Sequence, residues 1–374
     1  MTVQVRSFAK INLGLRIGES RADGFHELLT VYQTIALHDV IRVSMARGSG
    51  IEIRCADPRV PRDGSNTCYR IVERAMEALG AKRRVIIEIE KRLPVQGGLG
   101  GASSNAVATL LGIERALKKG LPTEEKLRIA AEVGSDPPLF LVGGTVLGVG
   151  RGEQVYPLPD LPAMPCVVVT PDVGVSTPKA FVGWDRRISQ GLKPESSQAP
   201  DAALKGRSST TPGERSVKKT TAEPRPAGQP GVAVPTRALA VQQKLTLSDT
   251  SDRMVELSRG LSAWLSELHS GAPSGIGGGG RAGNPLLRLV RAGIENDFER
   301  VVFPEYPELR EGKSALLRAG AKYASLSGSG SALYGLFVSK AAAASAVARL
   351  WKQGWTAQAT STLPRGAYWN RILR

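Results

Sequence analysis

A glycine- and serine-rich run in the first third of the chain is the part of the sequence best suited to chemistry. It reads PVQGGLGGASSNA from Pro94 to Ala106 and follows an alternating apolar stretch from Val85 to Ile89. Glycines let the backbone approach a phosphate group closely, and successive backbone N–H groups can form a nest for an anion. A helix that starts directly after the run would point its positive dipole end at the same phosphate. The run therefore predicts a phosphate-binding loop.

The spacing within this run excludes the two best-known nucleotide motifs. It lacks the Gly-Lys-Ser/Thr ending of a P-loop, and it does not sit in a βαβ dinucleotide-binding unit. A tight strand-to-helix turn capped by a serine is the simpler alternative. That alternative accounts for one or two glycines, whereas this run has glycine at positions 97, 98, 100 and 101.

A lysine and an aspartate could supply the other parts of a phosphoryl-transfer site. Lys10 stands in an Ala-Lys-Ile-Asn segment with Asn12 on the same face of an expected strand, and Asp136 stands in a Gly-Ser-Asp-Pro-Pro turn. Alone, a lysine on a strand is usually a solvated residue, and an aspartate in a turn is usually a capping or turn residue. A kinase needs a carboxylate at the attacking hydroxyl, a cation beside it and a phosphate cradle. The sequence contains all three.

The patterns around these residues predict a mixed α+β first half. Apolar residues alternate with polar or small ones in most of the expected strands, which cover residues 3–17, 41–53, 85–89, 140–149 and 166–170. Apolar residues recur at helical spacing in residues 66–79, and residues 102–118 form another expected helix. In this layout Lys10 lies on a strand, the glycine-rich run joins a strand to a helix, and Asp136 precedes a buried strand.

Two segments of different composition interrupt the second half. Residues 187–253 are rich in Ser, Thr, Pro, Gly and Lys and lose apolar periodicity, so we expect a disordered, low-complexity insertion there. Residues 271–284 form a second expected loop. The glycines Gly277–Gly280 suggest another phosphate site, but no strand precedes them, and a linker is favoured. Helical and strand patterns return from Pro285 onward.

Composition bounds the class of protein. The chain has 374 residues, 41% of them hydrophobic, enough for a large core and two domains. We expect no secretory signal and no membrane span, and the three scattered cysteines suit a reducing compartment, so the sequence predicts a cytoplasmic protein. A formal net charge of +16 suggests an anionic partner such as nucleic acid. The charge is dispersed and only 5% of residues are aromatic, so nucleic acid is not expected as the main ligand.

Three motifs, in this order, resemble those of the GHMP kinase superfamily. They are Ala9–Asn12, the run Pro94–Ala106, and a second glycine- and serine-rich run, Ser327–Ser331. Within the superfamily, shorter segments most resemble kinases of diphosphocytidyl-methylerythritol, among them Arg21–Leu28, Gly134–Pro138, Gly150–Glu153 and Asn296–Glu299. The resemblance extends over nearly the whole chain outside the two interrupting segments.

The resemblance implies an α+β fold of two domains. The N-terminal domain would resemble domain 2 of ribosomal protein S5 and cover residues 1–165. A ferredoxin-like C-terminal domain would comprise residues 166–186 and 254–374, with the active site in the cleft between the domains. The insertion 187–253 would touch none of the motifs.

The resemblance also implies a reaction. ATP, with Mg²⁺, would phosphorylate the 2-hydroxyl of a cytidine-diphosphate-linked methylerythritol on the non-mevalonate route to isoprenoid precursors. Asp136 would act as the base or orient the hydroxyl, and Lys10 would stabilise charge on the transferred group. The residues implied in ATP binding are Asn66, at the adenine, with Pro94, Gly97, Gly98, Leu99, Gly100, Gly101, Ala102, Ser103 and Ser104.

The cytidine end of the substrate would be bound by Asn12, Phe25, His26 and Phe181. The two phenylalanine rings would face the cytosine from opposite sides, although tyrosine is commoner in the family at the position of Phe25. The resemblance thus implies a small-molecule partner, and neither nucleic acid nor a membrane. No residue is assigned to the metal. The chain would be a monomer or a weak homodimer.

Two alternatives stay open. One is another GHMP kinase, such as a homoserine or mevalonate kinase, against which the Asp23–His26 segment argues. The other is a nucleic-acid-binding protein that uses an S5-like fold and the positive charge. The presence of both Lys10 and Asp136 argues against that second alternative.

Overall fold

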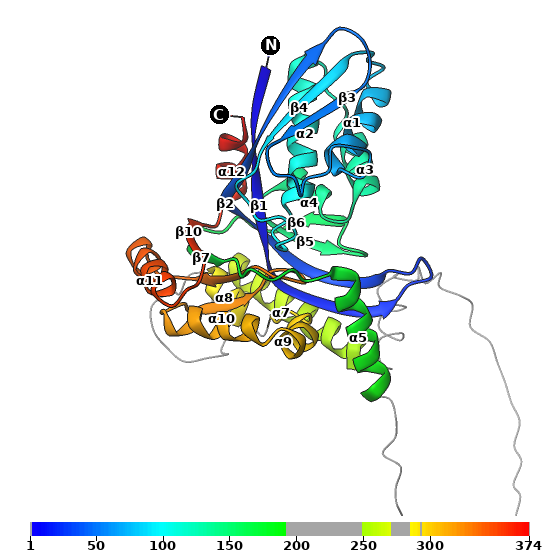
Figure 1. Ribbon diagram of the computed structural model, residues 1–374. Helices are drawn as coiled ribbons and strands as arrows, with labels where there is room; N and C mark the ends of the chain where they lie inside the picture. Colours follow the sequence, from blue (N-terminus) through cyan, green and yellow to red (C-terminus); the bar gives the residue numbers. More distant parts are fainter. Residues whose placement is uncertain (1, 192–248, 271–284, 292–293, 374) are drawn as a thin grey trace, which may run out of the picture.

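Two sheet-based units share one long hairpin (Figure 1). The computed structural model describes residues 2–191, 249–270, 285–291 and 294–373. The hairpin strands are β1, Thr2–Ser20, and β2, His26–Ala46, which pair antiparallel from Thr2↔Ser44 to Ser20↔His26. Side chains of both strands enter more than one apolar core, so the hairpin runs from one unit into the other.

The first unit is a six-stranded sheet covered by helices on one face. The strand order is β3–β4–β2–β5–β6, with β1 also beside β2. The four short strands are β3, Ile51–Cys55; β4, Arg84–Glu90; β5, Thr145–Val149; and β6, Gln154–Pro157. The helices are α1, Thr67–Ala78; α2, Gly101–Leu117; α3, Thr123–Val133; and α4, Pro137–Val142. These bounds confirm the helices predicted at residues 66–79 and 102–118.

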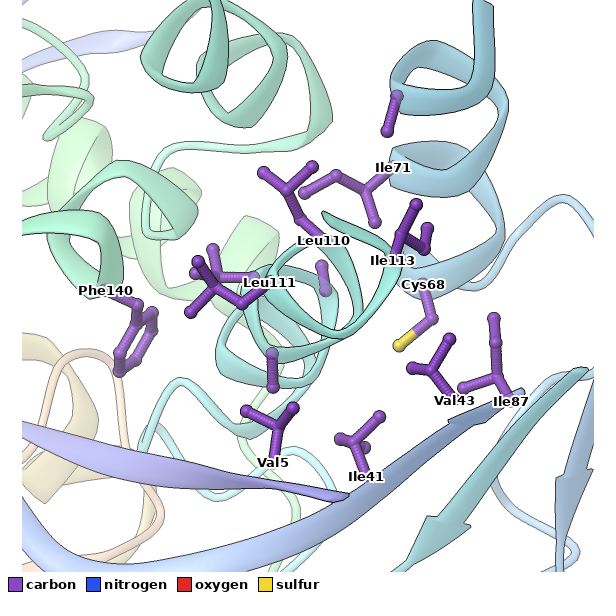
Figure 2. Close-up of a cluster of buried hydrophobic side chains, with 14 of the residues drawn as sticks. Val5, Ile41, Val43, Cys68, Ile71, Ile87, Leu110, Leu111, Ile113 and Phe140 are labelled. Atoms are coloured by element: carbon purple, nitrogen blue, oxygen red, sulfur yellow. The ribbon is translucent and has the colours of Figure 1, made fainter. Parts of the chain in front are cut away.

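Helix α2 lies at the centre of the first core (Figure 2). Leu110 and Ile113 of this helix pack near Ile71 of α1, while Val5 and Ile41 project toward them from the sheet. Each of these side chains is buried, which contributes roughly 1.5–3 kcal/mol apiece. Because α2 begins at Gly101, within the glycine-rich run, this packing fixes the second half of the run.

The second unit is a four-stranded sheet with the order β10–β7–β9–β8. Its strands are β7, Pro165–Val169; β8, Tyr323–Leu326; β9, Leu333–Leu336; and β10, Ala357–Ser361. Successive residues of β7 enter two different apolar clusters, Val168 one and Val167 the other, so both faces of this sheet are buried. The helices around it are α5, Thr177–Gly191; α7, Asp249–Ser270; α8, Pro285–Arg291; α9, Glu299–Glu305; α10, Pro307–Arg318; and α11, Lys340–Lys352.

Two features differ from the sequence-based expectation. The strand predicted for residues 140–149 is wrong in its first part, because Pro137–Val142 is helix α4 and only Thr145–Val149 is a strand. Two prolines at its start favour a helical φ, and positive φ angles at Gly143 and Gly144 end it. The last helix, α12, Arg365–Ile372, was assigned to the second domain but packs in the first core, where Tyr368 donates a 2.6 Å hydrogen bond to the Phe140 carbonyl.

Most of the predicted insertion 187–253 lies outside the described residues, since α5 ends at Gly191 and α7 begins at Asp249. The predicted linker 271–284, with Gly277–Gly280, also lies outside them. Among the helices that the structure describes, none combines the length and the apolarity needed to cross a bilayer.

Candidate active site

Lys10 lies in the middle part of β1, within a cluster of buried polar side chains. The residue is 4% exposed, and its Nζ lies 3.3 Å from Asp136 Oδ2. Nζ also donates a 2.7 Å hydrogen bond to Asn12 Oδ1, and Asn12 donates to Thr30 Oγ1 at 2.8 Å. A buried ammonium group requires such partners. The structure therefore brings the predicted Lys10, Asn12 and Asp136 together and excludes a solvated lysine.

Asp136 is the residue before α4, and its carboxylate makes no capping hydrogen bond to that helix. One carboxylate oxygen faces Lys10, and the other accepts a 3.2 Å hydrogen bond from the Tyr32 hydroxyl. The side chain remains 28% exposed, so an incoming group can reach it. This geometry excludes the helix-capping alternative for Asp136.

Tyr32 completes this group, and no sequence motif indicates it. It lies on β2 directly opposite Asn12 in the hairpin register, and Lys10 Nζ lies 5.5 Å from its ring centroid. Burial, and then the Asp136 carboxylate, raises the pKa of Tyr32 well above its usual value, so its hydroxyl stays a neutral donor. Lys10, Asn12, Tyr32 and Asp136 form the candidate catalytic group, which is called the reaction centre below.

The part of the run that precedes α2, residues 94–100, is called the glycine-rich loop and passes directly beside the reaction centre. The Lys10 backbone N–H donates a 3.0 Å hydrogen bond to the Leu99 carbonyl, and a Cβ at Gly100 would lie 2.9 Å from Lys10 Cγ. Gly100 has a φ of +69°, and no side chain caps the helix that starts after it. The first N–H groups of α2 are thus left for an anion. Part of the glycine content is explained by close packing, because the loop has no room for side chains here.

The second glycine- and serine-rich run packs on the first. A Cβ at Gly98, whose φ is +72°, would lie 2.2 Å from the Ser327 carbonyl oxygen. Ser327 Oγ donates to the Gly98 carbonyl at 3.0 Å, and the Ala332 N–H donates to the Gly97 carbonyl at 3.1 Å. The two runs therefore form one continuous surface contributed by both units. Beside it lies a cavity of about 310 Å³ lined by Gln96, Gly98, Val175, Ser176, Thr177, Pro178, Ser329 and Gly330.

Other residues predicted to bind ATP lie around the start of α2. Ser104 is buried, and its hydroxyl accepts a 2.6 Å hydrogen bond from Ser7 of β1, whereas Ser103 is half-buried. Asn66 caps α1, with its Oδ1 accepting from the Cys68 N–H at 2.8 Å and its Nδ2 donating to the Pro61 carbonyl at 2.6 Å. The adenine contact of Asn66 stays a prediction. The contact that holds α1 against α2 runs from Thr67 Oγ1 to the Ala102 carbonyl, at 2.7 Å. Pro94 packs against the turn, since a Cβ at Gly97 would lie 2.8 Å from its Cγ.

Phe25, His26 and Phe181, called the pyrimidine region below, lie at the far end of the hairpin and on α5. The His26 and Phe181 rings stack at 4.9 Å with an interplanar angle of 10°. His26 Nε2 lies 2.7 Å from Asp185 Oδ1, a partner that no motif indicates. Phe25 is 49% exposed, with the Arg151 guanidinium 4.9 Å from its ring centroid. Phe25 is therefore not a core residue, and its contact with a cytosine stays a prediction.

Comparison with known proteins places the chain in a kinase superfamily. The models for the GHMP kinases N terminal domain and the GHMP kinases C terminal domain match residues 66–144 and 283–356. The first range contains the glycine-rich loop and Asp136, and the second contains Ser327–Ser331. The predicted α+β GHMP fold with its two domains is confirmed.

Full-length relatives decide the family. The chain is 34% identical to the 4-diphosphocytidyl-2-C-methyl-D-erythritol kinase of Solibacter usitatus (strain Ellin6076), over 89% of this chain and 80% of the relative. It is 32% identical to the enzyme of that name from Heliobacterium modesticaldum (strain ATCC 51547 / Ice1), over 92% and 89%. The chain belongs to the 4-diphosphocytidyl-2-C-methyl-D-erythritol kinase family.

Solved structures agree with this membership. A crystal structure of a 4-(cytidine 5'-diphospho)-2C-methyl-D-erythritol kinase covers 96% of this chain, with 98% of its own chain covered, at 25% identity and a TM-score of 0.61. A homoserine kinase from Cytophaga hutchinsonii ATCC 33406 has a TM-score of 0.60 at 20% identity, and that likeness concerns the fold alone. In this member of the 4-diphosphocytidyl-2-C-methyl-D-erythritol kinase family, the reaction centre lies where the hairpin, α4 and the glycine-rich loop meet.

Proposed function

We propose that this chain transfers the γ-phosphoryl group of ATP to the 2-hydroxyl of 4-diphosphocytidyl-2-C-methyl-D-erythritol, a step of isoprenoid precursor biosynthesis. The observation that carries the proposal is the Lys10–Asp136 pair, 3.3 Å apart beside the glycine-rich loop, in a chain of this kinase family. A carboxylate, a cation and a phosphate cradle are the parts that phosphoryl transfer to a hydroxyl requires.

Asp136 receives the proton of the attacking hydroxyl. In this step the hydroxyl oxygen bonds to the γ-phosphorus, the bond from that phosphorus to the bridging oxygen of ADP breaks, and the hydroxyl proton passes to the Asp136 carboxylate. Tyr32 holds one carboxylate oxygen by its hydrogen bond, so the other remains directed at Lys10 and the acceptor. A positioned base of this kind contributes about 10²–10⁴-fold to rate.

Lys10 stabilises the negative charge that develops on the attacking oxygen and the moving phosphoryl group. Because the residue is 4% exposed, its charge acts through a medium of lower dielectric than water. Asn12 accepts a hydrogen bond from Nζ and is itself fixed by Thr30, which limits the positions that the ammonium group can take. Asn12 therefore orients Lys10 in addition to its predicted contact with the substrate.

The glycine-rich loop and the start of α2 hold the ATP phosphates. Positive φ angles at Gly98 and Gly100 turn successive backbone units, and the uncapped helix start adds N–H donors. The Lys10–Leu99 backbone hydrogen bond links this cradle to the strand that carries the reaction centre. This link supports a transferred phosphorus that lies close to Asp136.

The residues present fit a magnesium ion that arrives with the nucleotide. The described residues contain no cluster of three or more His, Cys, Asp or Glu side chains that could form a dedicated cage. Mg²⁺ in kinases commonly keeps water and phosphate oxygens and takes only one or two protein ligands. Asp136, partly exposed, and the Ser103 hydroxyl at the loop are the side chains that would hold it. When bound, Mg²⁺ neutralises charge on the β- and γ-phosphates.

The pyrimidine region supports a substrate with a flat base at its far end. Phe25 offers an exposed ring at the turn of the hairpin, and Phe181 is half-buried on α5. The stack of His26 on Phe181 occupies one face of the Phe181 ring. We propose that the cytosine lies between Phe25 and Phe181, with His26 at its polar edge. This position requires the His26 ring to leave the face of Phe181 that it covers in this structure.

We also propose that the main partner is this small molecule and not a nucleic acid. Many arginines on the first sheet are paired with acids instead of forming a free basic surface, for example Arg42 with Glu90 at 2.9 Å and Arg84 with Glu52 at 2.6 Å. The three cysteines are buried and free, which supports a cytoplasmic location. We propose that the chain is a monomer or a weak homodimer.

Coupled measurement of ADP release tests the function. The purified chain is given ATP with 4-diphosphocytidyl-2-C-methyl-D-erythritol, homoserine or mevalonate in parallel. We expect turnover with the cytidine compound at a kcat/KM at least about 100-fold above the other two. Preferred turnover of homoserine or mevalonate would overturn the proposal and favour another GHMP kinase.

A further inference from the structure

Asp39 is a buried carboxylate that the reaction scheme does not use. It lies on β2 opposite Ser7 of β1 and is 0% exposed. A carboxylate in such surroundings is costly unless every one of its oxygens has a strong partner. Asp39 has four donors, which are the Lys91 ammonium group, the backbone N–H groups of Arg92 and Leu93, and the side-chain amide of Asn105.

These donors flank the glycine-rich loop on both sides. Three of them come from residues 91–93, which lead from β4 into the loop. The backbone nitrogens of Arg92 and Leu93 lie 2.7 Å and 2.8 Å from Asp39 Oδ1. The fourth comes from Asn105 on α2, which leaves the loop, and its Nδ2 lies 3.1 Å from Asp39 Oδ2. A single side chain therefore joins the entrance of the loop to its exit.

Two further contacts make this junction tight. Lys91 Nζ lies against the first residue of α2, because a Cβ built on Gly101 would be 3.5 Å from it. Ser7, opposite Asp39, donates to Ser104 at 2.6 Å and ties the same helix turn to the hairpin. The buried Oδ1 of Asn105 has no hydrogen-bond partner among the residues that the structure describes, so the hydrogen bond to Asp39 is the one that orients its amide there.

A carboxylate suits this position better than an amide. Ionised Asp accepts hydrogen bonds with both oxygens and donates none, whereas Asn presents a donor on one side. With Oδ1 still accepting from the N–H groups of Arg92 and Leu93, an amide nitrogen would face the donors of Lys91 and Asn105. The exit contact would be lost and the Lys91 charge would be left buried without its partner.

We propose that Asp39 is a positioning residue for ATP, which holds the two ends of the glycine-rich loop at the separation that phosphate binding requires. The proposal rests on the function proposed above, in which this loop binds the nucleotide. Asp39 touches neither substrate. Its substitution should therefore weaken nucleotide binding selectively and leave the proposed cytidine-binding residues, at the far end of the hairpin, unchanged.

The test uses Asp39→Asn in the full chain. The affinity for a non-hydrolysable ATP analogue is measured by calorimetry, and KM is measured for ATP and for the acceptor. Because small misplacements of a binding group cost up to about 100-fold, we expect the analogue Kd and the ATP KM to rise about 10- to 100-fold. The acceptor KM should stay within about 2-fold of the unsubstituted protein.

Asp297→Asn is the matched control. Asp297 is also a buried carboxylate, 1% exposed, that accepts from the Ile17 N–H at 3.0 Å and pairs with Arg16 and Arg253. These partners among the described residues all lie outside the glycine-rich loop. We expect a comparable fall in Tm, with the affinity for the ATP analogue within about 2-fold of the unsubstituted protein.

Two more variants keep the test decisive if Asp39→Asn folds poorly. Asn105→Ala removes only the exit contact and should weaken the ATP analogue about 3- to 10-fold. The exchange Asp39→Asn with Asn105→Asp moves the carboxylate to α2, where it can accept from the amide at position 39. This exchange should recover affinity to within about 3-fold of the unsubstituted protein.

A lower Tm with unchanged analogue affinity in both Asp39→Asn and Asn105→Ala would overturn the proposal. So would equal increases in the KM values of ATP and the acceptor. Failure of the proposed function looks different, because the unsubstituted protein would then bind the ATP analogue but not phosphorylate the cytidine compound. In that case the selective loss of analogue affinity in Asp39→Asn would still support the positioning role.

Discussion

The reaction centre and the pyrimidine region both lie on the β1–β2 hairpin, yet they are held in different ways. At the reaction centre, Lys10, Asn12 and Tyr32 are buried and bonded to one another or to Asp136. In the pyrimidine region Phe25 is 49% exposed, and His26 contacts side chains of α5. The first group is fixed by the hairpin and α4, while the second depends on a helix of the other unit.

This difference predicts that one region determines the rate of the reaction and the other determines substrate binding. Groups that are fixed before substrate binds are suited to stabilising the transition state, which raises kcat. Exposed rings that close on a ligand contribute to ground-state binding, which lowers KM. Substitutions in the two regions should therefore affect different kinetic constants, and the following experiments test that separation.

Asp136→Asn should give the largest effect, a fall in kcat of about 10²–10⁴-fold with the ATP KM within about 2-fold, because the proposed proton acceptor is lost. Steady-state kinetics measures it. Asp160→Asn is the matched control, since Asp160 is a partly exposed carboxylate that accepts from the Arg365 N–H at 2.6 Å, outside the reaction centre. Near-normal turnover of a folded Asp136→Asn protein would remove Asp136 from the mechanism.

Gly98→Ala should lower kcat/KM for ATP about 100-fold. The added Cβ would lie 2.2 Å from the Ser327 carbonyl oxygen, so the two glycine-rich runs must separate. Gly80→Ala is the control, because Gly80 has a φ of +60° with nothing within 4 Å of the added Cβ. It should cost about 1 kcal/mol of stability through backbone strain alone, with normal kinetics. Equal kinetics for both variants would show that the contact between the runs is not needed.

Phe25→Ala should raise the KM for the cytidine compound about 5- to 150-fold and leave the ATP KM unchanged, since one stacked ring contributes about 1–3 kcal/mol. Tm should change little, because the side chain is 49% exposed. Tyr156→Ala, which removes an aromatic ring that is 53% exposed on β6, should change neither KM. An unaltered cytidine KM in Phe25→Ala would exclude the proposed sandwich.

Tyr32→Phe should have the smallest effect, a fall in kcat of about 3- to 10-fold, because one hydrogen bond of about 1 kcal/mol to Asp136 is lost. The raised pKa of Tyr32 means that its hydroxyl stays protonated at neutral pH, so the fall should be the same from pH 6 to 8. Tyr368→Phe, which removes a buried hydroxyl bonded to the Phe140 carbonyl, should lower Tm without this loss of kcat. A pH-dependent loss in Tyr32→Phe would contradict the assignment.

The sequence could predict the residues that belong to contiguous motifs. Lys10, Asp136 and the glycine-rich loop each stand in a short segment whose residue types suffice to suggest a role. The α+β class and the helices α1 and α2 follow from apolar spacing that is long enough to be unambiguous. For these features, local chemistry and the final fold agree.

The sequence could not predict residues whose roles come from pairing between distant segments. Tyr32 joins the reaction centre because the hairpin register places it opposite Asn12, and Asp39 meets residues 91–93 only across the sheet. Asp185 reaches His26 from α5. The run at residues 139–142 is apolar enough for either a strand or a helix, and the preceding prolines and following glycines decide in favour of α4.

The shared hairpin joins the apolar cores of the two units. Val5 and Ile41 belong to the first apolar core, Ile11 and Val31 to the second, and Leu15 to the third, so each core of the described residues takes side chains from the hairpin. Unfolding of either sheet would remove apolar contacts that the other sheet makes with the hairpin. We therefore expect the two units to unfold in one transition, in which the calorimetric and van't Hoff enthalpies are equal. We also expect that a chain cut between them yields no half that folds alone.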